Sequence, residues 1–307
     1  MLLVSSLFSN PRELPSSYLF RTGTASSSAL TASCLCGAVR IEVNLTTTTL
    51  RPLARCACLS CRRYGVASFA SYLEIDALPE EAEYLAYDDS CATFGAIERL
   101  ACKHCRSKIG ARRRDDGASF LAAGCFDDIP ESLAARWRGD DAETKDDAPW
   151  MRLLPVQNIR ALRTSSTFGG GCRCGACRFR VRGLFPGELQ HCYCSICRKL
   201  SGSAFQTWMP ARALRWTTTG GGALDLVRTT PHGRRHQCRR CGSVMTIIYD
   251  SQPETPWPAA GAIDDDAFDD DDDKRASIYR IIHICCDTLP PWFRLPKDGY
   301  PRLRYAS

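Results

Sequence analysis

The amino-acid sequence predicts a mainly β protein built from two tandem zinc-binding modules of antiparallel sheet. Three observations predict this class. One cysteine pattern occurs twice in a single register, apolar and polar residues alternate between the cysteines, and most of the 19 cysteines lie in C-x-C or C-x-x-C clusters. A chain of 307 residues has room for two domains. We expect a disordered leader over residues 1–30, a first module over 31–157 and a second module over 168–303.

The internal repeat is the strongest of these observations. The segment 34–38 (CLCGA) recurs as 172–176 (CRCGA), and the later cysteines of the first copy recur in the same order. Seven cysteine positions that keep one register indicate a tandem duplication of a single module. The other recurring cysteines are Cys56, Cys58, Cys61, Cys102 and Cys105 in the first copy and Cys192, Cys194, Cys197, Cys238 and Cys241 in the second.

The segments between the cysteines predict strands with one buried and one solvated face. Residues 39–45 alternate apolar and polar side chains, and so do residues 177–182. Further strands are expected over 69–73, 205–209, 224–228 and 277–285, and a short helix over 130–138. A small antiparallel unit has a thin core, so we expect bound metal ions to stabilise each module.

Composition and charge exclude several classes of protein. No apolar run approaches the ~18 residues that span a bilayer, which excludes an integral membrane protein. The net charge of +6 is spread over 40 basic and 34 acidic residues, so no nucleic-acid partner is expected. Clustered thiols in a long chain are typical of metal ligands in a reducing compartment. We therefore expect the cytoplasm, with mitochondrial targeting by the leader as the alternative. The aspartate run over 264–273 is expected to be a solvated insertion.

Two cysteine groups in each module together fit a closed zinc site. The glycine after each C-x-C permits a turn that brings both thiolates to one ion, and C-x-x-C closes a tight loop around a metal. Combining the C-x-C with the distant C-x-x-C gives four thiolates, the ligand set of a structural zinc. These ligands are Cys34, Cys36, Cys102 and Cys105 in the first module and Cys172, Cys174, Cys238 and Cys241 in the second.

The remaining cysteine group of each module offers three thiolates. Three protein ligands leave zinc an open position, and three thiolates favour a further sulfur ligand over water chemistry. Basic residues follow directly and could offset the negative charge or bind carboxylates. The predicted catalytic cysteines are Cys56, Cys58, Cys61, Cys192, Cys194 and Cys197, and the basic residues are Arg62, Arg63, Arg198 and Lys199. The prediction is therefore up to two zinc ions per module and four per chain.

The cysteine spacing alone leaves two other interpretations open. Each module could hold only structural zinc and act as an adaptor for partner proteins that the sequence does not identify, or it could be a nucleic-acid zinc module. Single histidines at His191 and His283 are expected to be packing or surface residues. Five cysteines without a repeat partner are expected to be small packing residues: Cys91, Cys125, Cys177, Cys285 and Cys286.

The order of the motifs resembles the glutathione-dependent formaldehyde-activating enzyme family, which includes the centromere protein V-like proteins. The resemblance covers nearly all of residues 31–303, because the motifs occur once in each of the two copies. The matching segments are 33–40, 56–63, 99–107, 123–128 and 148–150 in the first copy and 171–178, 192–199, 235–243, 260–265 and 290–292 in the second.

This resemblance implies a fold, a metal content and an activity. The implied fold is the β-tent, similar to the Mss4-like fold, with a four-thiolate structural zinc and a three-thiolate catalytic zinc in each module. The implied activity is the condensation of glutathione with formaldehyde to S-hydroxymethylglutathione, formally a carbon–sulfur lyase reaction run in reverse. Glutathione or another small thiol is therefore the expected partner.

The two copies differ in how closely they follow the family pattern. The first has Arg106 where the motif places glycine, whereas the second keeps 241–243 (CGS) and 201–205 (SGSAF). We therefore expect the second module to carry any activity and the first to be mainly structural.

Overall fold

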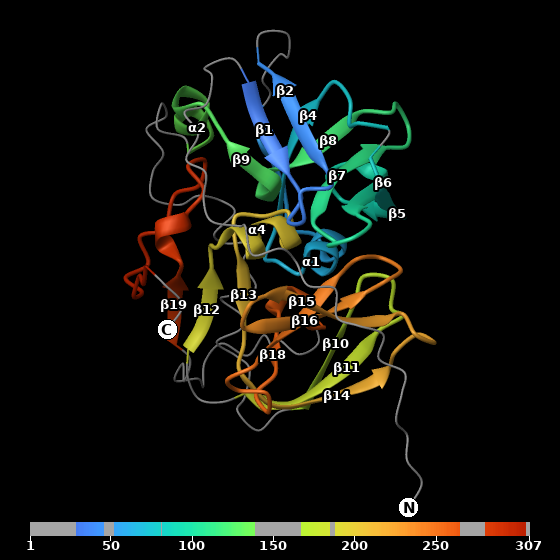
Figure 1. Ribbon diagram of the computed structural model, residues 1–307, viewed down its shortest axis with the longest axis vertical. Coiled ribbons are helices and arrows are strands. Elements are labelled where there is room, and N and C mark those ends of the chain that lie inside the picture. The colour runs from blue at the N-terminus through green and yellow to red at the C-terminus, as the bar shows by residue number, and fades with distance from the viewer. Residues whose placement is uncertain are drawn as a thin grey trace, which may run out of the picture.

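The computed structural model describes residues 29–45, 52–80, 82–138, 167–184, 188–264 and 280–304. In these ranges the strands form five sheets, and the first and second halves of the chain make up the upper and lower parts of the molecule in Figure 1. The longest helix within these ranges has eight residues. No helix of the described ranges has the length and apolar character of a membrane-spanning helix.

The first half contains a three-stranded and a six-stranded antiparallel sheet, with strand orders β2-β1-β9 and β3-β4-β8-β7-β6-β5. Its alternating segment places Ile41 and Val43 in the core and exposes Arg40 and Glu42. The elements are β1 (Ala29–Ser33), β2 (Arg40–Asn44), β3 (Ala54–Cys56), α1 (Leu59–Gly65), β4 (Ala70–Ile75), β5 (Tyr84–Cys91), β6 (Gly95–Cys102), β7 (Lys108–Arg113), β8 (Ser119–Ala122), η1 (Ala123–Cys125), β9 (Phe126–Asp128) and α2 (Glu131–Arg138).

The second half contains three sheets, with strand orders β10-β11-β14, β13-β12-β19 and β15-β16-β17-β18. All of its strand pairs are antiparallel except β12 with β19, which run parallel with His191 opposite His283. The elements are β10 (Thr167–Gly171), β11 (Arg178–Leu184), β12 (Glu188–Cys192), α4 (Ser195–Ser201), β13 (Gln206–Trp208), β14 (Ala211–Thr218), β15 (Leu224–Thr230), β16 (Gly233–Cys238), β17 (Val244–Tyr249), β18 (Trp257–Pro258), η2 (Ala260–Ala262), β19 (Arg280–Ile284) and η4 (Cys286–Thr288).

The prediction of a mainly β protein of antiparallel sheets is confirmed. The helix expected over 130–138 is α2, and the strand expected over 224–228 is the first part of β15. The helices α1 and α4 were not predicted, because seven residues are too few to show a helical period. Residues 1–28, the motif at 148–150 and residues 265–273 of the aspartate run lie outside the described residues.

The two halves pack around the pair of helices α1 and α4, which lie between them in Figure 1. The contacts are reciprocal, since α4 packs on η1 and α1 packs on η2. A Cβ atom on Gly124 of η1 would lie 2.2 Å from the carbonyl oxygen of Arg198, and one on Gly261 of η2 would lie 2.6 Å from the amide nitrogen of Ala67. Only glycine allows these backbones to approach so closely.

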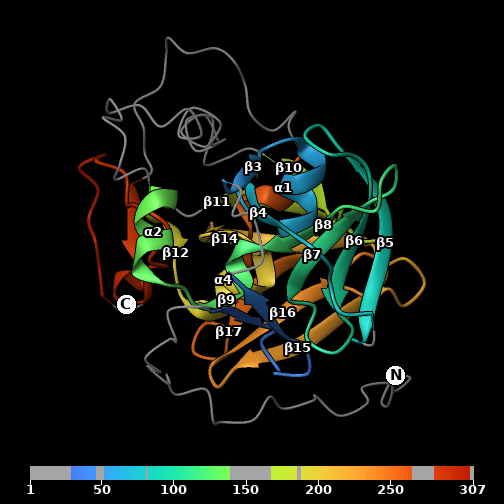
Figure 2. The same cartoon turned by 90° about the horizontal axis from the view of Figure 1, so that it is seen from above.

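One continuous apolar core joins the halves. Phe69 of the first half meets Phe205 and Phe293 of the second, at ring-centroid distances of 5.8 Å and 6.3 Å. The C-terminal segment lies beside α2 in Figure 2, and its Trp292 packs edge-on against Phe126 of β9. The apolar core therefore continues from one half of the chain into the other.

Candidate metal centres

Two clusters contain the four thiols predicted to form closed sites. In the first half, the Sγ atoms of Cys34 and Cys36 are 3.5 Å apart, and those of Cys36 and Cys102 are 3.7 Å apart. The second half repeats both distances in the cluster formed by Cys172, Cys174, Cys238 and Cys241. Four sulfurs around one zinc, at about 2.3 Å each, would lie about 3.8 Å from one another. The donor set and its spacing therefore fit a structural zinc.

Backbone turns bring these thiols together as the sequence predicts. Gly37 and Gly175 adopt positive φ values of 75° and 76°, so each C-x-C turns instead of continuing a strand. The residue that directly follows each C-x-x-C adopts the same conformation. Gly242 has φ 75° and Arg106 has φ 65°. Arg106 thus occupies a backbone region that costs a non-glycine residue about 1–2 kcal/mol.

Buried hydroxyl and amide groups surround the four-thiol clusters. Ser107 Oγ lies 3.2 Å from Cys105 Sγ and accepts a hydrogen bond from the Leu35 amide at 2.9 Å. Ser243 Oγ makes the corresponding contacts, at 3.3 Å to Cys241 Sγ and 3.1 Å to the Arg173 amide. Such outer contacts orient metal ligands, and they tie each C-x-C loop to its C-x-x-C loop.

The second half brings together the three thiols that were predicted to form an open site. Cys192 is the last residue of β12, Cys194 precedes α4, and Cys197 lies in the first turn of that helix. Their Sγ atoms lie within 4.8 Å of one another, and those of Cys192 and Cys194 are 3.5 Å apart. Cys192 and Cys197 are buried, whereas Cys194 is partly exposed. A ligand could therefore approach this cluster on the side of Cys194.

Polar groups hold this cluster in place. The Cys197 amide donates to Cys194 Sγ at 3.4 Å, and the Arg235 guanidinium donates to Cys197 Sγ at 3.6 Å. The hydroxyl group of Tyr193, the residue between two of the cysteines, lies 2.8 Å from His283 Nδ1. His283 Nε2 is in turn 3.0 Å from an Asp298 carboxylate oxygen. His283, which lies in β19, therefore holds the loop between Cys192 and Cys194 in place.

His191 and Cys285 also lie close to the three-thiol cluster. His191 is buried, and its Nδ1 is 2.8 Å from Thr207 Oγ1. Burial and the charge of His283 lower the pKa of His191 to about 3, which keeps its ring neutral. The Sγ atom of Cys285 lies 3.9 Å from that of Cys192. Cys285 is not one of the three thiols whose Sγ atoms all lie within 4.8 Å of one another.

The equivalent cluster of the first half contains a cysteine that the sequence analysis assigned to packing. Besides Cys56, Cys58 and Cys61, the structure brings Cys91 from the end of β5 into the same group of mutually close thiols. Its Sγ lies 3.4 Å from that of Cys56 and 3.4 Å from that of Cys61. No signal in the sequence identified Cys91, because it has no partner in the repeat register.

The four basic residues predicted beside these clusters contact groups within the protein. Arg63 forms an ion pair with Asp264 of the other half, and Lys199 Nζ forms the reciprocal pair with Asp127 at 2.6 Å. Each of the other two residues bonds a carbonyl group of its own cysteine loop. Arg62 Nε donates to the Ala57 oxygen at 3.1 Å, and Arg198 Nε donates to the Tyr193 oxygen at 3.3 Å.

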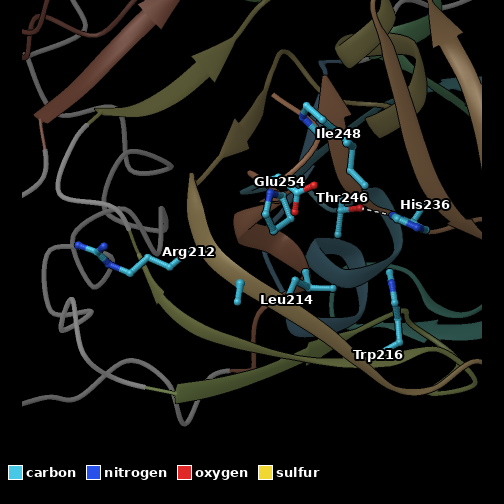
Figure 3. A pocket seen from close by; sticks show the side chains of 10 residues that line it. Arg212, Leu214, Trp216, His236, Thr246, Ile248 and Glu254 are labelled. Carbon is cyan, nitrogen blue, oxygen red and sulfur yellow. Dashed lines mark hydrogen bonds between the residues drawn. The ribbon is translucent and has the colours of Figure 1, made fainter. Parts of the chain in front are cut away.

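A cavity of about 310 Å³ lies away from the cysteine clusters (Figure 3). His236, hydrogen-bonded to Thr246, lines it together with Trp216 and Glu254. Neighbouring residues of a strand point to opposite faces, and the preceding residue, Arg235, points to Cys197. The cavity therefore opens on the face of β16 opposite to the three-thiol cluster.

The donor chemistry of all four clusters fits metal ions. All 19 cysteines are free thiols, so no disulfide competes for these sulfurs. A hydrogen bond from Cys61 lowers the pKa of the Cys58 thiol to about 6, which favours the thiolate form that binds metals. Soft thiolate donors suit zinc, and each cluster could hold one ion.

Comparison with known proteins agrees with the repeated clusters. The family model described as "Glutathione-dependent formaldehyde-activating enzyme" matches residues 29–139 and again residues 167–280. The chain belongs to this family, as the resemblance of its motifs predicted.

Two individual proteins are similar to parts of the chain. A Halomonas elongata protein named "Putative glutathione-dependent formaldehyde-activating enzyme" is 31% identical over 147 residues, which are 43% of this chain and 87% of that protein. A solved structure of a Rhodobacter sphaeroides protein is 28% identical, with a TM-score of 0.25, and the match covers 29% of this chain and 82% of that one.

Proposed function

We propose that the second module is a zinc-dependent site of the carbon–sulfur lyase class that acts on glutathione adducts. In the favoured reaction, the glutathione sulfur bonds to the carbon of formaldehyde. The carbon–oxygen π bond breaks, and the thiol proton ends on that oxygen to give S-hydroxymethylglutathione. The reverse reaction breaks the same carbon–sulfur bond, and a related small thiol could replace glutathione.

One observation carries this proposal. Cys192, Cys194 and Cys197 form a three-thiol group, and Cys285, whose Sγ lies 3.9 Å from that of Cys192, stays outside it. These three residues would hold zinc and leave one position for an exchangeable ligand. When bound, zinc supplies a Lewis-acid centre whose thiolate surroundings suit a sulfur substrate.

Side chains of this chain keep that site in the required form. The Arg235 guanidinium at Cys197 Sγ stabilises a thiolate, because a positive charge favours the ionised state. Arg198 bonds the Tyr193 carbonyl and His283 bonds the Tyr193 hydroxyl, so the loop between Cys192 and Cys194 is fixed from two sides. A fixed set of ligands places an incoming thiol reproducibly.

The prediction that Arg62, Arg63, Arg198 and Lys199 bind glutathione carboxylates requires these side chains to exchange their present contacts. Arg63 and Lys199 already neutralise Asp264 and Asp127 across the interface between the halves. We propose that their first role is to join the two modules. This arrangement also favours the second candidate function, a zinc-stabilised adaptor without turnover.

Turnover measurements distinguish the two functions. The rate of S-hydroxymethylglutathione formation from glutathione and formaldehyde is measured with zinc-loaded protein and with its Cys194→Ser variant. A matched control is Cys286→Ser, which removes a partly buried thiol outside the four clusters. The enzyme proposal expects acceleration by the wild type and the control, and none by Cys194→Ser. An adaptor would give the uncatalysed rate in all three cases.

A further inference from the structure

The β5–β6 hairpin of the first half carries a thiol to a cluster that was expected to be open. Residues Tyr87 and Arg99 are paired across this hairpin, and the pairing continues to Cys91 opposite Gly95. Cys91 is therefore the last residue of β5, and it is buried with 5% of its surface exposed. Its Sγ lies 3.4 Å from both Cys56 and Cys61, close to the sulfur spacing of about 3.8 Å around a tetrahedral zinc.

We propose that Cys91 is the fourth ligand of a closed metal site formed with Cys56, Cys58 and Cys61. The first half would then hold two structural ions, and its counterpart of the open site would have no position for a substrate. Four thiolates complete the coordination of a structural zinc, whereas catalytic zinc keeps a position free. This assignment concerns the metal alone and stands whether or not the second half is an enzyme.

The second half lacks the residue that closes the site because its hairpin is shorter. The pair equivalent to Tyr87 and Arg99 is Val227 and Arg235. Between these paired residues the first hairpin has residues 88–98, whereas the second has only residues 228–234. The last pair of the second hairpin joins Thr230 to Gly233 across a bulge, and no cysteine lies between them. The three-thiol cluster there receives no ligand from this side.

Charged groups also surround the first cluster. Arg99 is fully buried, donates to Cys61 Sγ at 3.4 Å and is ion-paired with Asp89 at 2.6 Å. Arg173, from a four-thiol loop of the second half, reaches the same carboxylate at 2.6 Å. A positive charge beside a four-thiolate zinc offsets part of its net negative charge. Arg173 of the second half thus extends the polar network beside this cluster.

Metal retention tests the proposal without any measurement of turnover. Zinc-loaded full-length protein is treated with a mild chelator, and the zinc that remains is counted for the wild type, for Cys91→Ser and for Cys125→Ser. Cys125 is a matched control because it is a buried thiol of the same half whose Sγ donates to the Lys108 carbonyl at 3.0 Å, outside every cluster. We expect three retained ions per chain in the wild type and the control, and two in Cys91→Ser.

A second measurement covers the case in which Cys91→Ser fails to fold. Anomalous scattering at the zinc edge, from crystals of the wild type, should place an ion in contact with the Cys91 sulfur. Equal zinc retention by the wild type and Cys91→Ser would overturn the proposal. So would an ion bound by Cys56, Cys58 and Cys61 alone, or a disulfide between Cys91 and Cys56 found by mass spectrometry of the unreduced protein.

Discussion

Replacing Asp89 by alanine should destabilise the protein strongly, because this carboxylate serves two guanidinium groups. The Asp89 side chain is 1% exposed and accepts hydrogen bonds from Arg99 and Arg173, both at 2.6 Å. Ser60 Oγ adds a third bond at 2.7 Å. The variant would leave the guanidinium of Arg99, which is 0% exposed, without its carboxylate partner.

The expected loss follows from this burial. Removing one partner of a buried ion pair costs about 3–5 kcal/mol, because the remaining charge stays desolvated. For a chain of this size, that loss lowers the unfolding midpoint by roughly 6–20 °C. The adjacent Asp88→Ala is the matched control, since Asp88 is 78% exposed and pairs with Arg114 at the surface. An exposed pair contributes about 0–1 kcal/mol.

Thermal and urea unfolding of the zinc-loaded proteins measure both variants. Burial raises the pKa of the Asp89 carboxyl. The hydrogen bond from Arg173 and the charge of Arg99 lower it, and together with the other hydrogen bonds they outweigh burial, so the net pKa is below its ordinary value. The stabilisation is therefore present above the unfolded pKa of about 3.9 and is lost as the pH falls through the lower folded value. If Asp89→Ala costs no more than Asp88→Ala at pH 7, the reasoning from burial is refuted.

Three further predictions concern the turns, the interface and the metals. Arg106→Gly should stabilise the protein by up to about 1 kcal/mol in urea unfolding, because Arg106 has φ 65°. A lower stability of this variant would show that Arg106 is not strained. Lys199→Met should cost about 1–3 kcal/mol, because Lys199 Nζ bonds Asp127 and Ser33 across the interface. A double-mutant cycle with Asp127→Asn should show coupling, and additive losses would exclude it. Stripping all metal with a strong chelator should remove the cooperative unfolding transition seen by calorimetry, and an unchanged transition would show that the clusters do not stabilise the fold.

The sequence predicted which thiols of the four-thiol groups lie close together and where the chain turns between them. The repeat and the spacing of the cysteines identified both four-thiol groups, and the glycines after each C-x-C identified the turns that Gly37 and Gly175 make. Alternation identified the faces of the strands at Ile41 and Val181. These features depend on residues close in the chain or on a pattern that occurs twice.

Features that depend on distant pairing were not predictable. Cys91 joins Cys56 and Cys61 only because the β5–β6 hairpin is long enough to reach them. The register in which β5 and β6 pair cannot be deduced from a single sequence. The ion pairs of Arg63 and Lys199 cross between the two halves, so their partners depend on how the modules pack. Local periodicity contains no information about either.

The most direct test of the open site in the second half is a glutathione titration of the cobalt-substituted protein, followed by absorption spectroscopy. Cobalt bound by thiolates changes its spectrum when a further sulfur binds. We propose that Cys91 closes the first cluster and that Cys192, Cys194 and Cys197 leave one position free, so the spectrum should change with saturation at one glutathione per chain. The change should be lost in Cys194→Ser. Saturation at two glutathione molecules per chain, or no change at all, would contradict the account.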